Sequence, residues 1–462
     1  MENLEISKIM NLESDQIDSC LNSDIIKVAV IGIGRIGLPT AILFAKSGLS
    51  TIGVDINKNL VEKIQNKIFP LNDEPGMKEL FDDVLSNQKF SVTTDIQNAL
   101  SQTNVVILSL PTPMTDENIP DYSSLESVGQ QLHDFLNPGS LVIVESTVEP
   151  GFVENTLISI IEGNDKKFEA GKTFGIGVCP ETANPGEILK DFKNLPRLIG
   201  GINKKSQELI SSIYSHVFSV DLIPMPNCKT ANAVKLTTNV FRDVNIAFVN
   251  ELAILFEKLG IDIFTVLDAA KRKYNFQVHY PGSGVGGPCL PVNSYQLINS
   301  ARSNSLSIPK LISISREINE KMPFHTLELL NDALNSINKK LEKSTIGILG
   351  ISYKPNVKDI QLAPAEKIIS KLKSLKCNVK IFDPYFISTN IFSIDSESKF
   401  EDMVKNSDAI LVLTSHQEFS SINPEIFTKL MKIPLIVDTR GLFDPKELNK
   451  LKIVFRGIGR PN

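Results

Sequence analysis

A chain of 462 residues is long enough for about three domains. Its apolar and charged fractions, 42% and 22%, are ordinary for a globular protein, and its net charge of -5 gives no basic footprint for nucleic acid. No apolar run reaches the roughly 18–20 residues needed to cross a bilayer, so no membrane span is expected.

The N-terminal segment and the cysteines give information on the compartment. Residues 1–24 are polar and acidic, without the basic start and apolar centre of a signal peptide. We expect a short helix or a disordered tail there. The 5 cysteines contain no CxxC pair, so neither a disulfide framework nor a metal site is expected, and a reducing cytoplasm fits.

Secondary-structure patterns divide the rest of the chain into three parts. From residue 25, short β-rich runs alternate with helical stretches, which is typical of a mostly parallel sheet. Strands are expected at 27–33, 51–55, 105–110, 141–145 and 175–178. Apolar residues at helical spacing predict one long helix over 227–257, with further helices to about residue 335. A second block then has expected strands at 345–350, 379–382, 409–413, 435–438 and 452–455.

The predicted fold is therefore α/β, with two Rossmann-like doubly wound domains joined by a central helical domain that contains one long helix. The expected boundaries are an N-terminal extension at 1–24, a first α/β domain at 25–226, the helical domain at 227–335 and a second α/β domain at 336–462.

A glycine-rich turn follows the first expected strand. Gly32, Gly34 and Gly37 form G-x-G-x-x-G between an apolar strand and a helical run. The first glycine permits a tight turn, the second lets backbone amides approach a pyrophosphate, and the third lets helix and strand pack closely. Asp55 closes the next strand, where its carboxylate would accept the ribose hydroxyls of NAD and repel the extra phosphate of NADP. A structural turn and a strand-capping Asp are the alternatives.

A second glycine-rich segment carries a cysteine. Residues 280–293 read YPGSGVGGPCLPVN, and four glycines and three prolines predict a rigid loop with backbone amides available to anions. Cys289 lies in this loop. A lone cysteine is usually a small buried hydrophobe, but a loop built to approach a ligand favours a nucleophile that attacks a carbonyl.

Together these motifs resemble the UDP-glucose/GDP-mannose dehydrogenase family over nearly the whole chain from residue 25. Eight segments match in order: GIGRIG (32–37), VESTVEPG (144–151), CPETANPG (179–186), KLTTNVFRDVNIAFVNE (235–251), PGSGVGGPCLP (281–291), GISYKPNVKD (350–359), FDPY (382–385) and VDTRG (437–441). One match could arise by chance, whereas eight in register are improbable.

The resemblance implies a reaction and a set of catalytic residues. Family members oxidise the sixth carbon of a hexose to a carboxylate with two NAD per turnover. Cys289 would form a thiohemiacetal and then a thioester. Lys235 and Asn239, one helical turn apart, would stabilise the oxyanion. Thr147 would hold a proton-relay water, and Glu181 would act as the base in hydrolysis. A solvated lysine, a surface amide, a strand-end cap and a loop carboxylate are the respective structural alternatives.

The resemblance also assigns ligands and domains. Besides the glycines and Asp55, we expect Thr112 and Thr147 to contact NAD. The expected substrate contacts are Glu181, Lys235, Asn239, Gly284, Gly286, Tyr353 and Lys354. The first α/β domain would bind NAD, the second would bind the UDP-sugar, and the central helical domain would form a homodimer.

The sequence departs from the family pattern in several places. Asn293 stands where an Asp commonly follows the cysteine by four residues, and an amide cannot take a proton there. Gln361 replaces a frequent Arg. Pro288 replaces the His of the amino-sugar branch, and Thr182 stands where the amino-sugar branch has Arg. Val292 replaces the Lys of the UDP-glucose and GDP-mannose type.

The cysteine loop is more similar to the branch that oxidises UDP-N-acetylmannosamine or UDP-N-acetylglucosamine. We therefore expect UDP-N-acetyl-D-mannosamine as substrate, giving UDP-N-acetyl-D-mannosaminuronate for polysaccharide biosynthesis. The alternatives are UDP-N-acetylglucosamine, UDP-glucose or GDP-mannose, and a nucleotide-sugar-binding protein impaired in catalysis by Asn293. A hydroxyacid or 6-phosphogluconate type of dehydrogenase predicts neither Cys289 nor a third domain.

Overall fold

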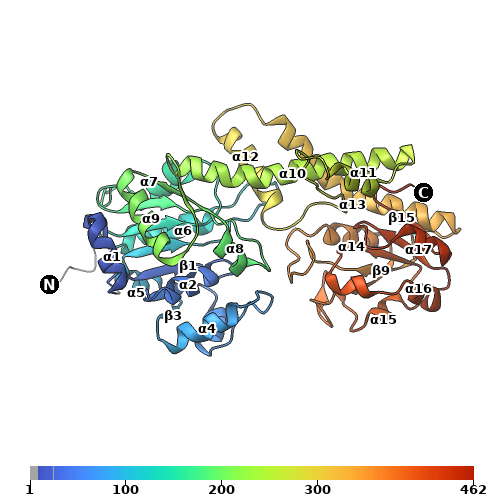
Figure 1. Cartoon of the computed structure of the whole chain (residues 1–462), viewed down its shortest axis with the longest axis horizontal. Coiled ribbons are helices and arrows are strands. Elements are labelled where there is room, and N and C mark those ends of the chain that lie inside the picture. Colours follow the sequence, from blue (N-terminus) through green and yellow to red (C-terminus); the bar gives the residue numbers. More distant parts are fainter. Residues whose placement is uncertain (1–8, 24, 462) are drawn as a thin grey trace. The chain divides into compact units, whose positions relative to one another are not determined.

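The computed structural model describes residues 9–23 and 25–461, apart from the side chains of residues 14 and 15. Residues 1–8, part of the expected N-terminal extension, lie outside the described residues. The chain forms two compact units (Figure 1). Unit 1 contains residues 1–238 and 295–306, and unit 2 contains residues 239–294 and 307–462.

Unit 1 is built on an eight-stranded sheet in the order β3-β2-β1-β4-β5-β6-β7-β8. Its first six strands have the 3-2-1-4-5-6 order of a dinucleotide-binding sheet. All neighbours are parallel except β6 and β7, which are antiparallel. The strands are β1 (Val28–Ile31), β2 (Thr51–Val54), β3 (Phe90–Thr93), β4 (Val105–Leu108), β5 (Leu141–Val144), β6 (Gly175–Val178), β7 (Arg197–Gly201) and β8 (Leu222–Pro224).

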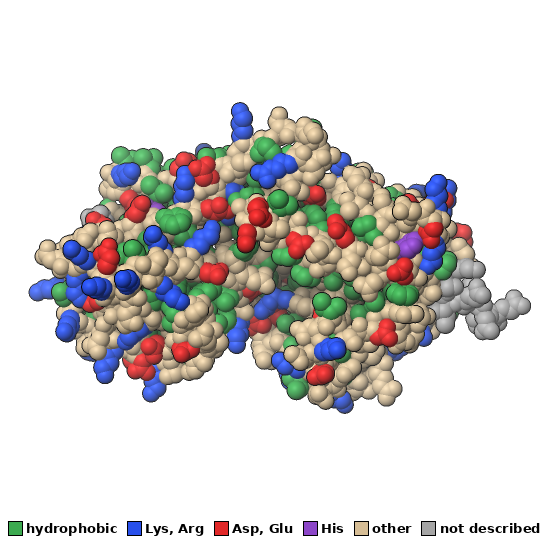
Figure 2. Space-filling model, turned by 180° about the vertical axis from the view of Figure 1, so that it is seen from behind, with side chains coloured by type: hydrophobic (Ala, Val, Ile, Leu, Met, Phe, Trp, Pro, Cys, Tyr) green, Lys and Arg blue, Asp and Glu red, His purple; other side chains and the backbone are tan. Residues whose placement is uncertain are grey.

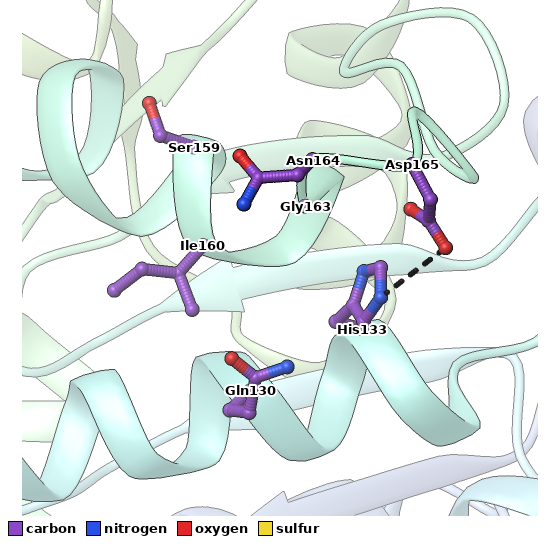
Figure 3. A pocket seen from close by; sticks show the side chains of 7 residues that line it. All are labelled: Gln130, His133, Ser159, Ile160, Gly163, Asn164 and Asp165. Carbon is purple, nitrogen blue, oxygen red and sulfur yellow. Dashed lines mark ion pairs between the residues drawn. The ribbon is translucent and has the colours of Figure 1, made fainter.

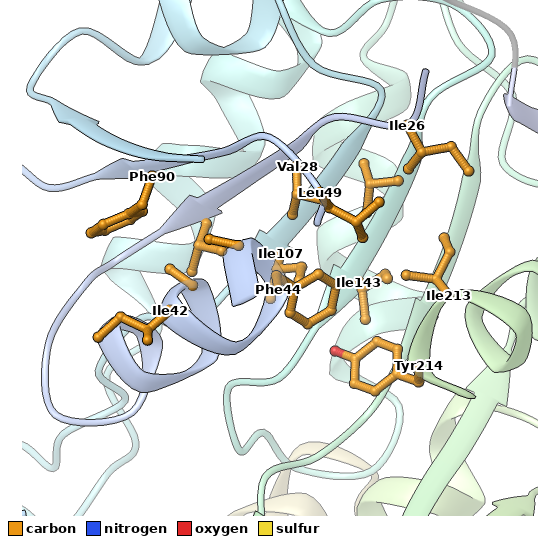
Figure 4. Close-up of a cluster of buried hydrophobic side chains, with 14 of the residues drawn as sticks. Ile26, Val28, Ile42, Phe44, Leu49, Phe90, Ile107, Ile143, Ile213 and Tyr214 are labelled. Carbon is orange, nitrogen blue, oxygen red and sulfur yellow. The ribbon is translucent and has the colours of Figure 1, made fainter. Parts of the chain in front are cut away.

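Both faces of this sheet are buried, which explains why its strands are continuously apolar. Successive side chains of a strand point to opposite faces. Val105 and Ile107 therefore join one hydrophobic cluster, while Val106 and Leu108 join another. Figure 4 shows the first cluster, in which Phe44 of α2 packs beside Ile107 and Tyr214.

Helices cover each face of the sheet. The helical elements of unit 1 are η1 (Ile9–Asn11), α1 (Ser14–Asn22), α2 (Gly37–Lys46), α3 (Lys58–Gln65), α4 (Met77–Ser86), α5 (Ile96–Ser101), α6 (Ser123–Phe135), η2 (Val153–Leu157), α7 (Ile158–Glu162), α8 (Ile188–Asn194) and α9 (Lys204–Val217). Of the two possibilities for the N-terminal segment, the structure has a helix at α1. It buries Ile17 and Leu21 against the face covered by α2 and α9.

Unit 2 contains a five-stranded parallel sheet in the order β10-β9-β13-β14-β15. Its elements are α11 (Ile263–Ala270), α13 (Lys310–Ser336), β9 (Thr345–Leu349), α14 (Pro364–Ser374), β10 (Asn378–Phe382), β11 (Asn390–Ile391), β12 (Ile394–Asp395), α15 (Phe400–Val404), β13 (Ala409–Val412), η3 (Gln417–Ser421), α16 (Glu425–Leu430), β14 (Leu435–Asp438), α17 (Pro445–Lys450) and β15 (Val454–Gly457). Alternate residues again face two clusters, Ile348 and Leu411 in one, Ile410 and Ile436 in the other.

Two helices contribute residues to both units: α10 (Cys228–Leu259), the expected long helix, and α12 (Leu290–Ser303). The fold class is confirmed, with two differences in detail. The strand expected at 452–455 begins only at Val454, because Lys452 has φ +56°, outside the strand region. The rigid loop expected to end at Asn293 ends at Cys289. Pro291 lies in the first turn of α12, where no intrahelical N–H is required.

The surface carries both signs of charge. On the face drawn in Figure 2, Lys and Arg side chains are interspersed with Asp and Glu. None of the helices in the described part of the chain has both the length and the hydropathy to cross a bilayer.

Candidate active site

The glycine-rich loop of unit 1 leaves space for a ligand at one position only. Gly32 follows β1 with φ +86°, and a Cβ there would lie 2.5 Å from the carbonyl oxygen of Ser109. A Cβ on Gly37, the first residue of α2, would lie 1.8 Å from the carbonyl oxygen of Gly32. A Cβ on Gly34 would meet nothing within 4 Å. Gly32 and Gly37 are thus required by packing, whereas Gly34 faces the space where a pyrophosphate would approach the N-terminus of α2.

Asp55 follows β2 and is tied to the same loop. One of its oxygens accepts the backbone N–H of Ile33 at 3.1 Å, and the other accepts that of Asn57 at 2.9 Å. Each oxygen keeps a further lone pair. The side chain is half-buried, so it can still accept hydroxyl groups. The loop and this carboxylate fit NAD.

Thr112 and Thr147 lie together at the carboxyl end of β4 and β5. The Thr112 hydroxyl donates to the backbone carbonyl of Thr147 at 2.9 Å, and the amide of Gln296 in α12 donates to the same carbonyl at 2.9 Å. This arrangement fixes the backbone of Thr147. No motif in the sequence pointed to Gln296.

Glu181 lies in the loop after β6, nearly buried. One oxygen accepts the backbone N–H groups of Thr182 and Ala183 at 2.6 and 2.7 Å. The other accepts from Arg197 Nη1 at 3.0 Å. The carboxylate is therefore held by three donors, and Arg197, in β7, is a partner that the motifs did not reveal.

The loop after Glu181 is clamped by a second carboxylate. Glu74 accepts the backbone N–H groups of Gly186 and Ile188, at 2.7 and 3.3 Å. It also accepts from Arg35 of the glycine-rich loop at 2.8 Å. Burial raises the pKa of Glu74, although these hydrogen bonds oppose the effect. Glu74 therefore connects the cofactor loop to the loop of Glu181.

In unit 2, Cys289 is exposed and immediately precedes α12. Its backbone carbonyl accepts the N–H of Asn293 at 2.9 Å, so Cys289 occupies the N-terminal cap of the helix. The partial positive charge of a helix N-terminus stabilises an anion such as a thiolate.

Asn293, which stands in place of the family's Asp, pairs with Asn239 of α10. The Asn239 amide donates to Asn293 Oδ1 at 2.6 Å, and both side chains are buried. The structure thus joins two of the predicted catalytic residues. Lys235 is also buried and lies one turn before Asn239 in the same helix.

A buried polar network holds the segment around Cys289 on both sides. On one side, Ser294 donates to Asp243 of α10 at 2.6 Å. On the other, the backbone N–H of Gly282 donates to Asn250 at 3.0 Å. Asn319 of α13 links the two: it donates to Asp243 and accepts from Asn250, at 2.8 and 2.9 Å.

The predicted glycines of the cysteine loop pack against α13, α14 and the segment that precedes α14. Gly284 has φ +127°, and a Cβ on Gly286 would lie 2.5 Å from the carbonyl oxygen of Leu362. A Cβ on Gly287 would lie 2.6 Å from the ring of Tyr353, so the cysteine loop lies directly on the loop that carries Tyr353 and Lys354. That loop follows β9, at the point where the strand order reverses and such sheets bind ligands.

Arg440, in the loop after β14, is a residue that sequence reasoning did not select. A Cβ on Gly282 would lie 2.3 Å from its Nη1, so the absence of a side chain at Gly282 makes room for it. Burial lowers the pKa of Arg440, with Asp438 opposing. The only sequence signal was its place in the VDTRG motif.

A hollow of the described surface lies elsewhere. It has a volume of about 430 Å³ between α6 and α7. Figure 3 shows His133 and Asp165 paired at one end of it, with their charged atoms 3.7 Å apart. None of its lining residues was predicted to be functional. Within the described residues, no group of three His, Cys, Asp or Glu side chains is placed to hold a metal ion.

The chain was compared with known proteins. Residues 26–218, 229–321 and 347–445 match the NAD-binding, central and UDP-binding domains of the UDP-glucose/GDP-mannose dehydrogenase family. The chain belongs to this family. NAD is therefore its cofactor, and it is an oxidoreductase of the nucleotide-sugar dehydrogenase class, which confirms the predicted family.

Several similar proteins within the family are named as dehydrogenases of UDP-N-acetyl amino sugars. The UDP-N-acetyl-D-mannosamine dehydrogenase of Pyrococcus horikoshii is 35% identical, over 94% of this chain and 99% of its own sequence. Its structure matches with a TM-score of 0.87, over 94% and 99% of the two chains. The UDP-N-acetyl-mannosamine dehydrogenase of Staphylococcus aureus matches with a TM-score of 0.81 at 31% identity, over 94% and 99%. The UDP-N-acetyl-D-glucosamine 6-dehydrogenase of Salmonella typhi is 31% identical, over 87% and 92%.

Proposed function

We propose that the protein oxidises the sixth carbon of UDP-N-acetyl-D-mannosamine to a carboxylate, giving UDP-N-acetyl-D-mannosaminuronate, with Cys289 as nucleophile. The observation that carries this proposal is an exposed cysteine at the N-terminal cap of α12, in a segment anchored by buried hydrogen bonds. The names of the relatives above favour the N-acetylmannosamine sugar.

The residues would act in sequence. NAD, when bound, accepts one hydride in each of the two oxidations. After the first, the Cys289 thiolate adds to the C6 aldehyde, forming a C–S bond and an oxyanion. Lys235 and Asn239 would donate hydrogen bonds to this oxygen, and one such donor contributes about 2.7–4 kcal/mol to transition-state stability. The second oxidation gives a thioester. Glu181 would take a proton from the water that hydrolyses it, releasing the Cys289 thiol and the sugar acid.

The positions of the other candidate residues fit roles in holding water and substrate. Thr147, whose backbone is fixed by Thr112, would hold the proton-relay water near the cofactor. Tyr353 and Lys354, together with Gly284 and Gly286, would contact the nucleotide sugar on the second sheet.

Asn293 favours one alternative, a nucleotide-sugar-binding protein impaired in catalysis, because its amide cannot accept a proton. The hydrogen bond from Asn239 supports a catalytically active enzyme, since the Asn293 amide keeps the shape and the acceptor of the usual carboxylate. On this reading, Glu181 and Lys235 handle the proton transfers.

The decisive experiment measures NADH released per sugar consumed, on UDP-N-acetyl-D-mannosamine, UDP-N-acetylglucosamine, UDP-glucose and GDP-mannose. We expect two NADH per UDP-N-acetyl-D-mannosamine and a thioester on Cys289 by intact mass spectrometry. A Cys289→Ser variant should form no thioester. Release of one NADH per sugar would contradict full oxidation. Turnover by Asn293→Asp with none by the native chain would show the impaired alternative to be correct.

We further propose a cytoplasmic homodimer formed through α10. Phe241, Phe248, Leu255 and Leu259 are exposed at spacings of seven, seven and four residues, so they share one stripe of the helix. Sedimentation of the native chain and of Phe248→Asp tests this proposal: the native chain should be a dimer and the variant a monomer.

A further inference from the structure

Behind Glu181, two carboxylates share one guanidinium. Arg197 Nη1 lies 3.0 Å from Glu181 Oε2 and 3.8 Å from Glu145 Oε1. We infer that Glu145 is a positioning residue that controls, through Arg197, how readily Glu181 accepts a proton. This inference rests on the proposed role of Glu181 as the base in thioester hydrolysis, and it adds a residue that the motifs did not assign.

Arg197 is buried beside two aromatic rings. Its side chain is 4% exposed. Its guanidinium carbon lies 3.8 Å from the ring centre of Phe218 and 4.6 Å from that of Phe192. Aromatic faces attract a desolvated cation. Its Nε and Nη2 have no hydrogen-bond partner among the described residues, so the paired edge of the guanidinium is the one facing Glu181 and Glu145.

Glu145 follows β5 and is enclosed by groups from several elements. Tyr214 of α9 donates to its Oε1 at 2.6 Å, and Thr40 of α2 donates to its Oε2 at 3.1 Å. Burial raises the pKa of Glu145 to about 7, against the opposing charge of Arg197, and the charge of Glu181 raises it further. Burial also raises the pKa of the neighbouring Cys179 thiol, to about 12, so this thiol stays neutral while Glu145 titrates.

The coupling between the two carboxylates must be reciprocal. If an ionised Glu181 makes Glu145 harder to ionise, an ionised Glu145 makes Glu181 a better proton acceptor by the same factor. Two carboxylates and one guanidinium carry a charge of -1 when both acids are ionised. When Glu145 takes up a proton, Arg197 neutralises Glu181 alone, and the base becomes weaker. Uptake of a proton by Glu145 in the pH range near 7 therefore changes the net charge beside Glu181.

The test compares thioester decay on Cys289 in the native chain and in Glu145→Gln, which keeps the size of the side chain but cannot ionise. A rapid-quench experiment with UDP-N-acetyl-D-mannosamine and NAD follows the adduct by mass spectrometry from pH 6 to 8.5. We expect equal decay rates at pH 6, where Glu145 is protonated, and decay in the variant slower by roughly threefold at pH 8. The matched control is Glu149→Gln, because Glu149 bonds to Asn299 and not to Arg197.

Tyr214→Phe is a milder change should Glu145→Gln fail to fold. It removes one hydrogen bond that favours the charged form of Glu145. The rate of thioester decay should therefore rise at a higher pH in this variant than in the native chain. A ratio of native to variant rates that is the same at every pH would overturn the inference.

A second measurement needs no turnover. The free energy of unfolding of unit 1 is measured by peptide-resolved hydrogen exchange between pH 5 and 8 for the native chain, Glu145→Gln, Glu181→Gln and the double variant. We expect the two single effects to be non-additive above pH 7 and additive at pH 5. Additivity at every pH would overturn the inference. Non-additivity without NADH release on any sugar would support the coupling while refuting the proposed function.

Discussion

Asp243 offers the sharpest test of how the cysteine segment is held. It is fully buried and accepts side-chain hydrogen bonds from Ser294, Arg316 and Asn319 at 2.6, 2.8 and 2.8 Å. Asp243→Asn keeps the shape but removes the buried carboxylate charge that lies 2.8 Å from Arg316 Nη1. Removing one partner of a buried ion pair costs about 3–5 kcal/mol. We expect a loss of that size in the stability of α10 and α13.

Peptide-resolved hydrogen exchange is the suitable assay, because the chain has no Trp and two compact units prevent a single two-state transition. Glu320→Gln is the control, and a partly exposed pair should lose less than about 1 kcal/mol. The double variant Asp243→Leu/Arg316→Met should recover most of the loss, since both charges of the buried ion pair are then removed together. The reasoning is refuted if the amides of α10 and α13 exchange as slowly in Asp243→Asn as they do in Glu320→Gln. Alkylation of Cys289 by iodoacetamide, faster in Asp243→Asn, would extend the effect to the cysteine segment.

Three further changes test the cofactor loop, the clamp and the departure at position 293. Gly34→Ala should melt like the native chain, because its Cβ meets only open space, yet bind NAD at least about tenfold more weakly in calorimetry, because that space would hold the pyrophosphate. Gly37→Ala should melt at lower temperature. Unchanged NAD affinity in Gly34→Ala would contradict the placement of the pyrophosphate. Glu74→Gln should lower the stability of unit 1 by about 1–3 kcal/mol in hydrogen exchange, because an amide cannot accept all three hydrogen bonds. A smaller loss would mean that the clamp is dispensable. Asn293→Asp buries a carboxyl, which raises its pKa above the unfolded value. Its stability relative to the native chain should therefore be greatest at low pH and fall as pH rises through that pKa; a relative stability that rises with pH would show that a cation compensates the charge.

Local periodicity and turn chemistry predicted most of the fold. Buried parallel strands are continuous apolar runs, so β1, β4 and β5 were predicted from sequence. The sequence did not reveal β7 and β8. The former, Arg197–Gly201, includes a charged residue and two glycines, and the latter ends in Pro224 and is partly exposed. Neither has the composition of a strand, and tertiary pairing decides the outcome.

The candidate site shows the same limit. The composition of its loop led to the selection of Cys289, and the family resemblance led to that of Glu181. Arg197 and Glu145 were not selected, since they are 52 residues apart in the chain, and only the sheet brings them within 3.8 Å. The pairing of Asn239 with Asn293 likewise depends on how α10 packs against α12. A residue that acts through another has no local signature.

The two sheets repeat one turn geometry. Gly32 follows β1 with φ +86°, and Gly350 follows β9 with φ +79°. A Cβ on Gly32 would lie 2.5 Å from the carbonyl oxygen of Ser109, and a Cβ on Gly350 would lie 2.6 Å from that of Thr414. In both sheets this oxygen belongs to the strand end across the point of reversal in strand order, so the same close approach excludes a side chain at both glycines.

The aspartates at the ends of the next strands are also equivalent, yet they differ in what they can bind. Asp55 accepts the N–H of Ile33 at 3.1 Å, and Asp383 accepts that of Ile351 at 2.8 Å. Asp55 remains half-buried. Asp383 is fully buried, and His416 lies 3.0 Å from the oxygen that bonds Ile351. A carboxylate that is paired with an imidazole and buried from solvent cannot also accept ribose hydroxyls. The first sheet therefore keeps, at this position, a carboxylate that can accept ribose hydroxyls, and the second sheet does not.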